Sequence, residues 1–144
     1  MKYLVFLLFF LVGTAEACRP RHYTDEQRFE KAQFIFTAKS ISAKTLKGDE
    51  VLIPYEPIEY SVVHDEIIKG KEPPNTITLA GCGAGSAEIG EISLFFVERY
   101  NSRWHGYAVT ESHFADNYSE LLAKVKLLAT NKKQNIDAPK DGAN

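Results

Sequence analysis

The chain has 144 residues, enough for one ordinary domain, with 44% hydrophobic and 25% charged residues. This composition excludes a wholly disordered chain and a membrane protein with several spans. Seventeen basic against nineteen acidic residues give a net charge of −2, so no basic surplus favours nucleic acid as a partner.

Residues 1–17 have the form of a secretory signal peptide. Lys2 supplies a positive charge, residues 3–12 are an uninterrupted apolar run, and residues 15–17 (Ala-Glu-Ala) form a small-x-small cleavage site. The apolar run is too short for a membrane-spanning helix, which needs about 20 residues. We therefore expect a secreted or periplasmic protein whose mature chain begins at Cys18.

The position of Cys18 leaves a second interpretation open. A cysteine directly after the cleavage site is also typical of bacterial lipoproteins, in which it is acylated and anchors the protein to a membrane. Lipoprotein signals favour leucine and a small uncharged residue where Ala15 and Glu16 stand here. The sequence thus favours export without a lipid. The protein would associate with a membrane only if Cys18 were acylated.

The two cysteines, Cys18 and Cys82, both lie in the exported part. In an oxidising compartment two thiols in a small domain usually pair, and a disulfide that closes so long a loop would stabilise the fold by about 4 kcal/mol. Two free thiols are the alternative. No metal centre within the chain is expected, because the histidines show no ligand spacing and two cysteines alone make no closed zinc site.

Taken in chain order, the mature sequence predicts strands between two helices. Thr24 and Gln27 have the spacing of a capping box and predict a short helix that ends near Ala32. Alternating, β-branched and aromatic residues then predict five strands, separated by segments rich in turn residues. The predicted strands are residues 33–41, 58–68, 76–80, 91–99 and 104–109.

A second helix is expected from Asp116 or Asn117 onward, because apolar residues recur there at helical spacing. These residues are Phe114, Tyr118, Leu121, Leu122, Val125 and Leu128. We interpret this stripe as a core-facing side, and Glu120 with Lys124 as an ion pair on the exposed side. The polar segment 131–144 is expected to be a disordered tail, which leaves residues 18–130 as one domain.

The order of these elements decides the fold class. The strands follow one another like hairpins without interleaved helices, which argues against a parallel sheet. We therefore expect a mainly β fold: a small five-stranded barrel of OB-fold type, with a short N-terminal helix and a C-terminal amphipathic helix.

Evidence for catalysis is weak. The sequence contains no G-x-S-x-G, H-E-x-x-H or P-loop motif, so we expect neither an enzyme nor a cofactor. Three other groupings have a functional and a purely structural interpretation, and the structural one is favoured for each. They are the carboxylates Glu88 and Glu91, the titratable run His64, Asp65 and Glu66, and the aromatic residues Tyr100, Trp104 and Tyr107.

Several short motifs between residues 29 and 97 resemble the N-terminal domain of tissue inhibitors of metalloproteinases and the wider netrin-like OB-fold group. A short helix leads into FEKAQFIFTAKSIS, which is similar to the family's first strand. The segments YSVVHDEIIKGKEPPNTITL and GCGAGSAEIGEISLFFV follow in the family's order, the second with a cysteine, a glycine-rich loop and a G-E-x-x-L-x-F-V strand. The spacing of the two cysteines is close to that of the family's first disulfide.

The resemblance implies a specific inhibitory mechanism. In the animal inhibitors the free amine and the carbonyl oxygen of the N-terminal cysteine chelate the catalytic zinc of the protease. Here this role would fall to Cys18, as a ligand of the partner's zinc only, with Cys82 as its disulfide tether and Arg19 directed at the specificity pocket. The chain departs from the family at Pro20, where the family has a second cysteine, and it lacks the family's other disulfides.

Two functions follow as expectations. The first is an exported inhibitor that binds a metalloproteinase through Cys18. The second is a secreted or lipid-anchored interaction module that binds an unknown extracytoplasmic protein without inhibiting any protease, since netrin-like barrels occur in proteins of both kinds.

Overall fold

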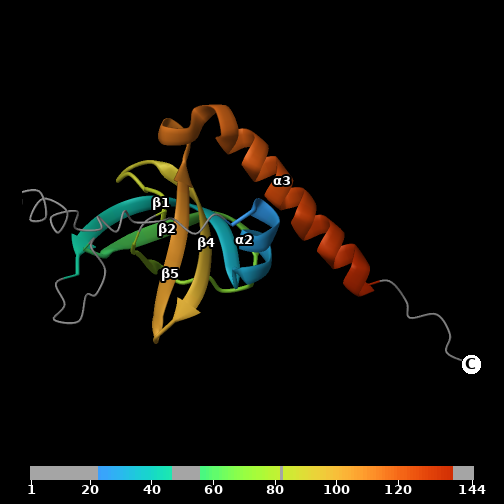
Figure 1. Ribbon diagram of the computed structural model, residues 1–144, viewed down its shortest axis with the longest axis horizontal. Coiled ribbons are helices and arrows are strands. Elements are labelled where there is room, and N and C mark those ends of the chain that lie inside the picture. Colours follow the sequence, from blue (N-terminus) through green and yellow to red (C-terminus); the bar gives the residue numbers. More distant parts are fainter. Residues whose placement is uncertain (1–22, 47–55, 82, 138–144) are drawn as a thin grey trace, which may run out of the picture.

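The computed structural model describes residues 23–46, 56–81 and 83–137. Two helices and five strands lie in these ranges (Figure 1). In chain order they are α2 (Asp25–Lys31), β1 (Phe34–Thr45), β2 (Ile58–Lys69), β3 (Thr76–Leu79), β4 (Ile92–Tyr100), β5 (Arg103–Thr110) and α3 (Glu111–Asp137). Within these ranges neither helix has the combination of length and hydropathy that crossing a bilayer needs.

The five strands close into a barrel in the order β1-β2-β3-β5-β4, and β4 returns to pair with β1. Neighbouring strands are antiparallel except β3 and β5, which run parallel with Leu79 opposite Gly106. A five-stranded barrel closed by such a crossover is of OB-fold type, so the predicted fold class is confirmed.

The strand β1 is long and bent, which lets it pair with two neighbours. Its pairing with β2 changes register at three places, the last between Ser40 and Ser42. Each change adds an unmatched residue and increases the local twist. The sequence predicted a loop from Lys44 onward, but β1 continues to Thr45 because Lys44 and Thr45 still pair with Glu59 and Ile58 on β2.

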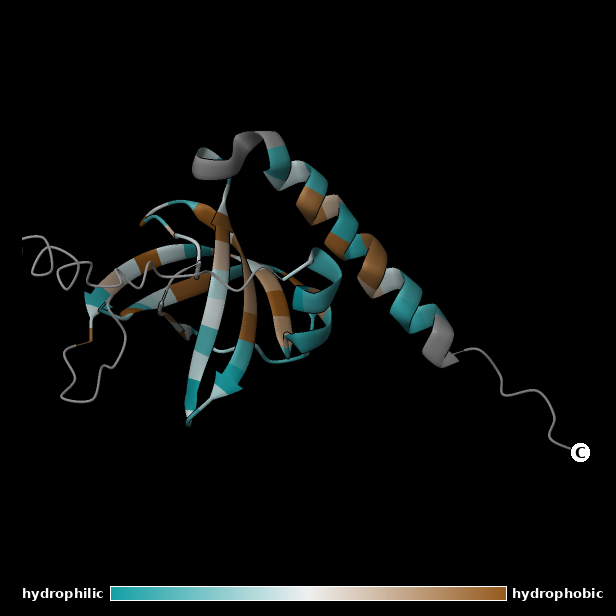
Figure 2. Cartoon of the chain, viewed as in Figure 1, coloured by the Kyte–Doolittle hydropathy of each residue, from teal (hydrophilic) through white to brown (hydrophobic). Residues whose placement is uncertain are grey.

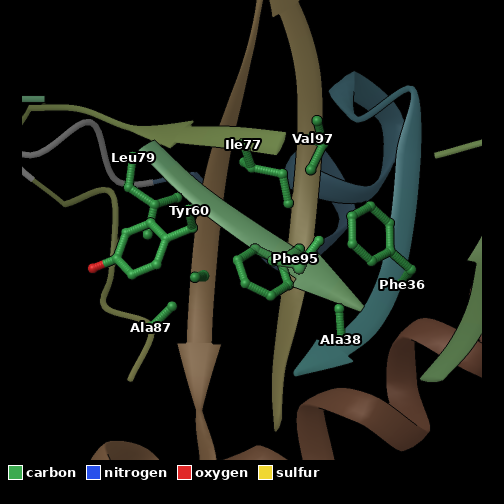
Figure 3. Packing of buried hydrophobic residues seen from close by; sticks show 10 residues of the cluster. Phe36, Ala38, Tyr60, Ile77, Leu79, Ala87, Phe95 and Val97 are labelled. Carbon is green, nitrogen blue, oxygen red and sulfur yellow. The ribbon is translucent and has the colours of Figure 1, made fainter. Parts of the chain in front are cut away.

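One hydrophobic cluster fills the barrel interior (Figure 3). Its rings include Phe36 and Phe95, whose centroids lie 5.7 Å apart in a stacked arrangement. The cluster consists of Phe36, Ala38, Tyr60, Val62, Ile77, Leu79, Ala87, Phe95, Val97 and Ala108. Figure 2 shows brown and paler or teal residues mixed along β1, whereas in β4 the five consecutive residues 93–97 are buried.

A second hydrophobic cluster lies outside the barrel, between its wall and the two helices. It consists of Phe29, Ala32, Ile35, Leu94, Phe96, Val109, Tyr118 and Val125, with partly buried Leu121, Leu122 and Leu128 packed against it. The predicted apolar stripe of the C-terminal helix is therefore core-facing at the positions that the structure describes. The side chain of Phe114 lies outside the described residues.

The helix α3 is longer at both ends than the sequence predicted. It begins at Glu111, directly after β5, rather than at Asp116 or Asn117, because no helix-breaking residue interrupts the intervening segment. At its other end it continues to Asp137, so residues 131–137 are helical and the prediction of a disordered tail is wrong for them. The last helical residue that the structure describes is Asp137, two positions before Pro139 in the sequence.

Candidate functional site

The predicted protease-facing residues, Cys18 and Arg19, and the predicted disulfide partner of Cys18, Cys82, all lie outside the described residues. The structure does describe the two elements to which they are attached. These are α2, which follows the N-terminal segment, and the loop between β3 and β4, which contains Cys82.

The helix α2 is fixed at both ends. Thr24 caps it: the side chain of Thr24 accepts from the backbone N–H of Gln27, and the side chain of Gln27 accepts from the backbone N–H of Thr24. This reciprocal pair is the predicted capping box. At the other end, the amine of Lys69 donates to the backbone carbonyl of Phe29, one of the carbonyls that a helix leaves unpaired.

Side chains of α2 also attach it to the barrel wall. Phe29 is buried in the outer cluster. The Arg28 guanidinium carbon lies 4.0 Å from the centre of the Tyr107 ring, on the outer side of β5. The helix α2 is therefore attached to the outer side of the barrel, with one of its contacts on β5.

The loop after β3 is pressed against the same strand. The carbonyl of Ala84 accepts from the N–H of Ala108 at 2.9 Å, and Gly85 forms a parallel bridge with Ala108. A Cβ at Gly85 would lie 1.8 Å from the Ala108 carbonyl oxygen, so only glycine permits this approach. Gly81 and Gly83, on either side of Cys82, both have positive φ angles, of 83° and 78°.

The helix α2 and the loop between β3 and β4 contact consecutive residues of β5. The helix α2 contacts Tyr107, and the cysteine-bearing loop contacts Ala108. The first of these residues belongs to the outer cluster and the second to the inner one, but their backbones are adjacent. One strand thus contacts both described elements that flank Cys18 and Cys82 in the sequence.

The run His64, Asp65 and Glu66 does not form a cluster. The Nε2 atom of His64 lies 3.2 Å from the carbonyl oxygen of Pro74, and its ring packs edge-on against Phe36. Asp65 and Glu66 turn outward: Asp65 accepts from the Thr37 hydroxyl at 3.0 Å, and Glu66 pairs with Lys126 at 2.7 Å. The structural interpretation of this run is therefore correct.

The aromatic residues near the turn after β4 do not form one ligand-binding face. Trp104 packs edge-on against Phe34 beside the inner cluster, whereas Tyr107 packs on Phe96 in the outer layer. Tyr100 is 62% exposed. An odd spacing along a strand places side chains on opposite faces, so the three-residue separation of Trp104 and Tyr107 was the signal that could have shown this.

The other titratable groups that the structure describes form no candidate metal centre. Glu88 is exposed and Glu91 is half-buried, and the backbone N–H of Glu91 donates to the backbone carbonyl of Glu88 at 3.2 Å. Over the described ranges, no group of three or more His, Cys, Asp or Glu side chains could hold a metal ion. Burial lowers the pKa of Lys69, with the nearby ammonium of Lys132 lowering it further, and burial likewise lowers the pKa of His105.

Two features went unnoticed in the sequence. One is the set of ion pairs between α2 and α3, since the ammonium of Lys124 lies 3.0 Å from Asp25 and 2.8 Å from Glu26 rather than against Glu120 as predicted. The other is the edge of β1 beyond Ser40, where no described residue pairs on the side away from β2. The ion pairs join elements far apart in the sequence, and the open edge depends on which strands pair with one another, so local periodicity carries no signal for either feature.

Comparison of the sequence with known proteins does not assign the chain to a family. No protein-family model matches the chain, and no curated protein matches its sequence significantly. The resemblance to the metalloproteinase inhibitors therefore depends on the short motifs and their order.

Proposed function

We propose that this chain is exported as a single-domain OB-fold protein and inhibits a zinc metalloproteinase through Cys18. After cleavage of residues 1–17, the α-amine and carbonyl oxygen of Cys18 would occupy the open positions of the partner's zinc ion. Arg19 would enter the adjoining specificity pocket. The alternative function is an interaction module, secreted or lipid-anchored, that does not use this amine.

One observation supports the inhibitor most: α2 and the loop around Cys82 contact β5 at consecutive residues, Tyr107 and Ala108. The chain from Tyr23 back to Cys18 is five residues, which span at most about 17 Å when extended. A disulfide between Cys18 and Cys82 requires the Cys82 loop to lie within that reach of Tyr23. A first residue tethered in this way loses little further freedom when it binds, which favours affinity.

The chemistry at Cys18 is tested first by intact mass. The protein is made in an exporting host and alkylated before and after reduction. We expect a mass that begins at Cys18, no lipid, and two alkyl groups that add only after reduction. Acyl chains on Cys18 would instead block the amine and support the lipid-anchored module.

Inhibition is tested on a panel of zinc metalloproteinases. Adding one alanine before Cys18 should abolish inhibition, because the amine is displaced from the zinc. The matched control adds one alanine after Asn144 and should inhibit normally. Cys82→Ser should weaken inhibition strongly while circular dichroism shows an intact barrel; full inhibition by this folded variant would contradict the tethered mechanism.

A further inference from the structure

The far end of β1 has an open edge. The strand pairs with β4 only as far as Lys39, but with β2 as far as Thr45. At Ser40 the gap is closed by backbone hydrogen bonds, with the N–H of Ser40 donating to Glu91 and its carbonyl accepting from Gly90. Beyond that point, no described residue pairs with residues 41–45 on the side away from β2.

The backbone groups that point out of this edge can be identified. The N–H of Leu46 donates to the carbonyl of Pro57 at 2.9 Å, so Leu46 faces the β2 side. Backbone direction alternates along a strand, which makes Lys44 face β2 and directs the N–H and C=O of Ala43 and Thr45 outward. Ala43 and Thr45, two positions apart on the open edge, each therefore direct one N–H donor and one C=O acceptor away from β2.

Few features of this edge would prevent another chain from pairing with it. Natural proteins guard open edges with charges, proline or a covering element. The charge on this edge belongs to Lys44, whose ammonium lies 2.7 Å from the Glu59 carboxylate and is thereby offset. Two large apolar side chains flank the edge in exposed positions, Ile41 at 54% and Ile89 at 61% exposure.

We propose that a second copy of this chain pairs with this edge, antiparallel and centred on Lys44. In that register Ala43 of each copy lies opposite Thr45 of the other, and both residues exchange their N–H···O=C bonds, which gives four hydrogen bonds. The two Lys44 side chains meet at the centre, each already paired with Glu59. Pairing of this kind joins two barrels through a continuous sheet.

The shape and charge of the molecule are compatible with this dimer. The arrowhead of β1 lies on the side of the barrel away from α3, so the helix does not obstruct a second copy there (Figure 1). The net charge of −2 produces little long-range repulsion between two copies. Ile41 of each copy would lie near Leu46 of the other, which would shield part of an exposed apolar side chain.

The test is analytical ultracentrifugation of the mature protein over a wide concentration range, combined with amide hydrogen exchange. We expect the mass to rise toward that of a dimer with concentration. The amides of Ala43 and Thr45 should gain protection over the same range. Ala43→Pro removes one outward donor from each copy, on an edge where proline is tolerated, and should raise the dissociation constant about tenfold or more.

A second pair of variants changes side chains only and so avoids the backbone change that Ala43→Pro introduces. Ile41→Asp adds a charge beside the edge and should also weaken the dimer. Leu127→Asp makes the same kind of change at a residue of similar exposure, 60%, on α3, and should leave the dimer unchanged.

Three outcomes would overturn the proposal. One is a monomer at every concentration. Another is a dimer that tolerates Ala43→Pro and Ile41→Asp, which would use a different surface. The third is protection of the Ala43 and Thr45 amides in a monomer, which would mean that another part of the same chain covers the edge.

Discussion

Phe95 and Phe96 are neighbours on β4 and point into two different cores. Phe95 is fully buried inside the closed barrel, where Figure 3 shows it among the side chains of the inner cluster. Phe96 is 5% exposed and lies outside the barrel wall, beneath the helices. The inner core is therefore enclosed by a ring of backbone hydrogen bonds between strands, whereas the outer core is covered on one side by helices that pack on the barrel through their side chains.

The two cores are also closed by different means. The inner core is sealed at one end by the loop between β3 and β4, where Ala87 enters the cluster and the Ser86 carbonyl accepts from the Thr110 hydroxyl at 2.7 Å. The outer core is bordered by exposed ion pairs, which individually contribute little to stability. The helices should therefore open more easily than the barrel.

Truncating the two phenylalanines compares the cores directly. Phe95→Ala should lower the free energy of unfolding by about 4 kcal/mol, close to the whole stability of a small domain, because a closed barrel cannot collapse around the cavity. Phe96→Ala removes the same atoms, but α3 can move into part of the cavity that they leave. This variant should therefore lower the free energy of unfolding by about 3 kcal/mol. Urea unfolding followed by circular dichroism measures both; a larger loss for Phe96→Ala would reverse the assignment of the rigid core.

The seal of the inner core depends on one glycine. Gly85→Ala should cost about 3 kcal/mol, because the new Cβ would lie 1.8 Å from the Ala108 carbonyl oxygen and the φ angle is +74°. Gly90→Ala is the matched control, with φ +92° and no atom within 4 Å of the new Cβ. It should cost only about 1 kcal/mol from backbone strain. Equal thermal unfolding temperatures for the two variants would show that the loop does not seal the barrel.

Hydroxyl groups at the same end of the barrel give a smaller effect. Ser40 is fully buried, and its Oγ has no hydrogen-bond partner among the described residues. Ser40→Ala should therefore raise stability by about 1 kcal/mol. Ser93→Ala should lower it by a similar amount, about 1 kcal/mol, because it breaks the 2.7 Å hydrogen bond to the Thr110 hydroxyl. A loss of stability in Ser40→Ala would indicate that a buried water molecule satisfies this hydroxyl.

Much of this fold could be predicted from local sequence. The capping box at Thr24, the buried strand that contains Phe95 and the apolar stripe through Val125 are each set by residues a few positions apart. The barrel class followed from their order. The end of β1 was missed because it depends on pairing of Lys44 with Glu59, which no local pattern encodes.

The candidate site was predictable only in part. Sequence reasoning could propose Cys18, Arg19 and Cys82, which lie outside the described residues, but it could not show that α2 and the Cys82 loop meet at β5. It also assigned Lys124 to Glu120, four residues away on the same helix. The carboxylates that Lys124 contacts, Asp25 and Glu26, are on another helix and are remote in sequence.

These ion pairs between the helices make the outer core sensitive to pH. The hydrogen bond between Glu26 and Lys124 lowers the pKa of Glu26 from 4.5 to about 2. The hydrogen bond between Glu30 and Lys132 likewise lowers the pKa of Glu30. Because both pKa values are lowered by folding, this stabilisation is complete above pH 4.5 and is lost as the pH falls toward 2. Both carboxylates are on α2, and both lysines are on α3.

We therefore expect acid to loosen α3 before it loosens the barrel. Between pH 5 and pH 2, amide protection factors should fall in α3 while those in β4 are retained. Lys124→Gln should lower the α3 protection factors at neutral pH and reduce their dependence on pH. If the amides of α3 and β4 instead lost protection together at every pH, the helices and the barrel would form one cooperative unit, and the distinction between a rigid inner core and a separable outer layer would be wrong.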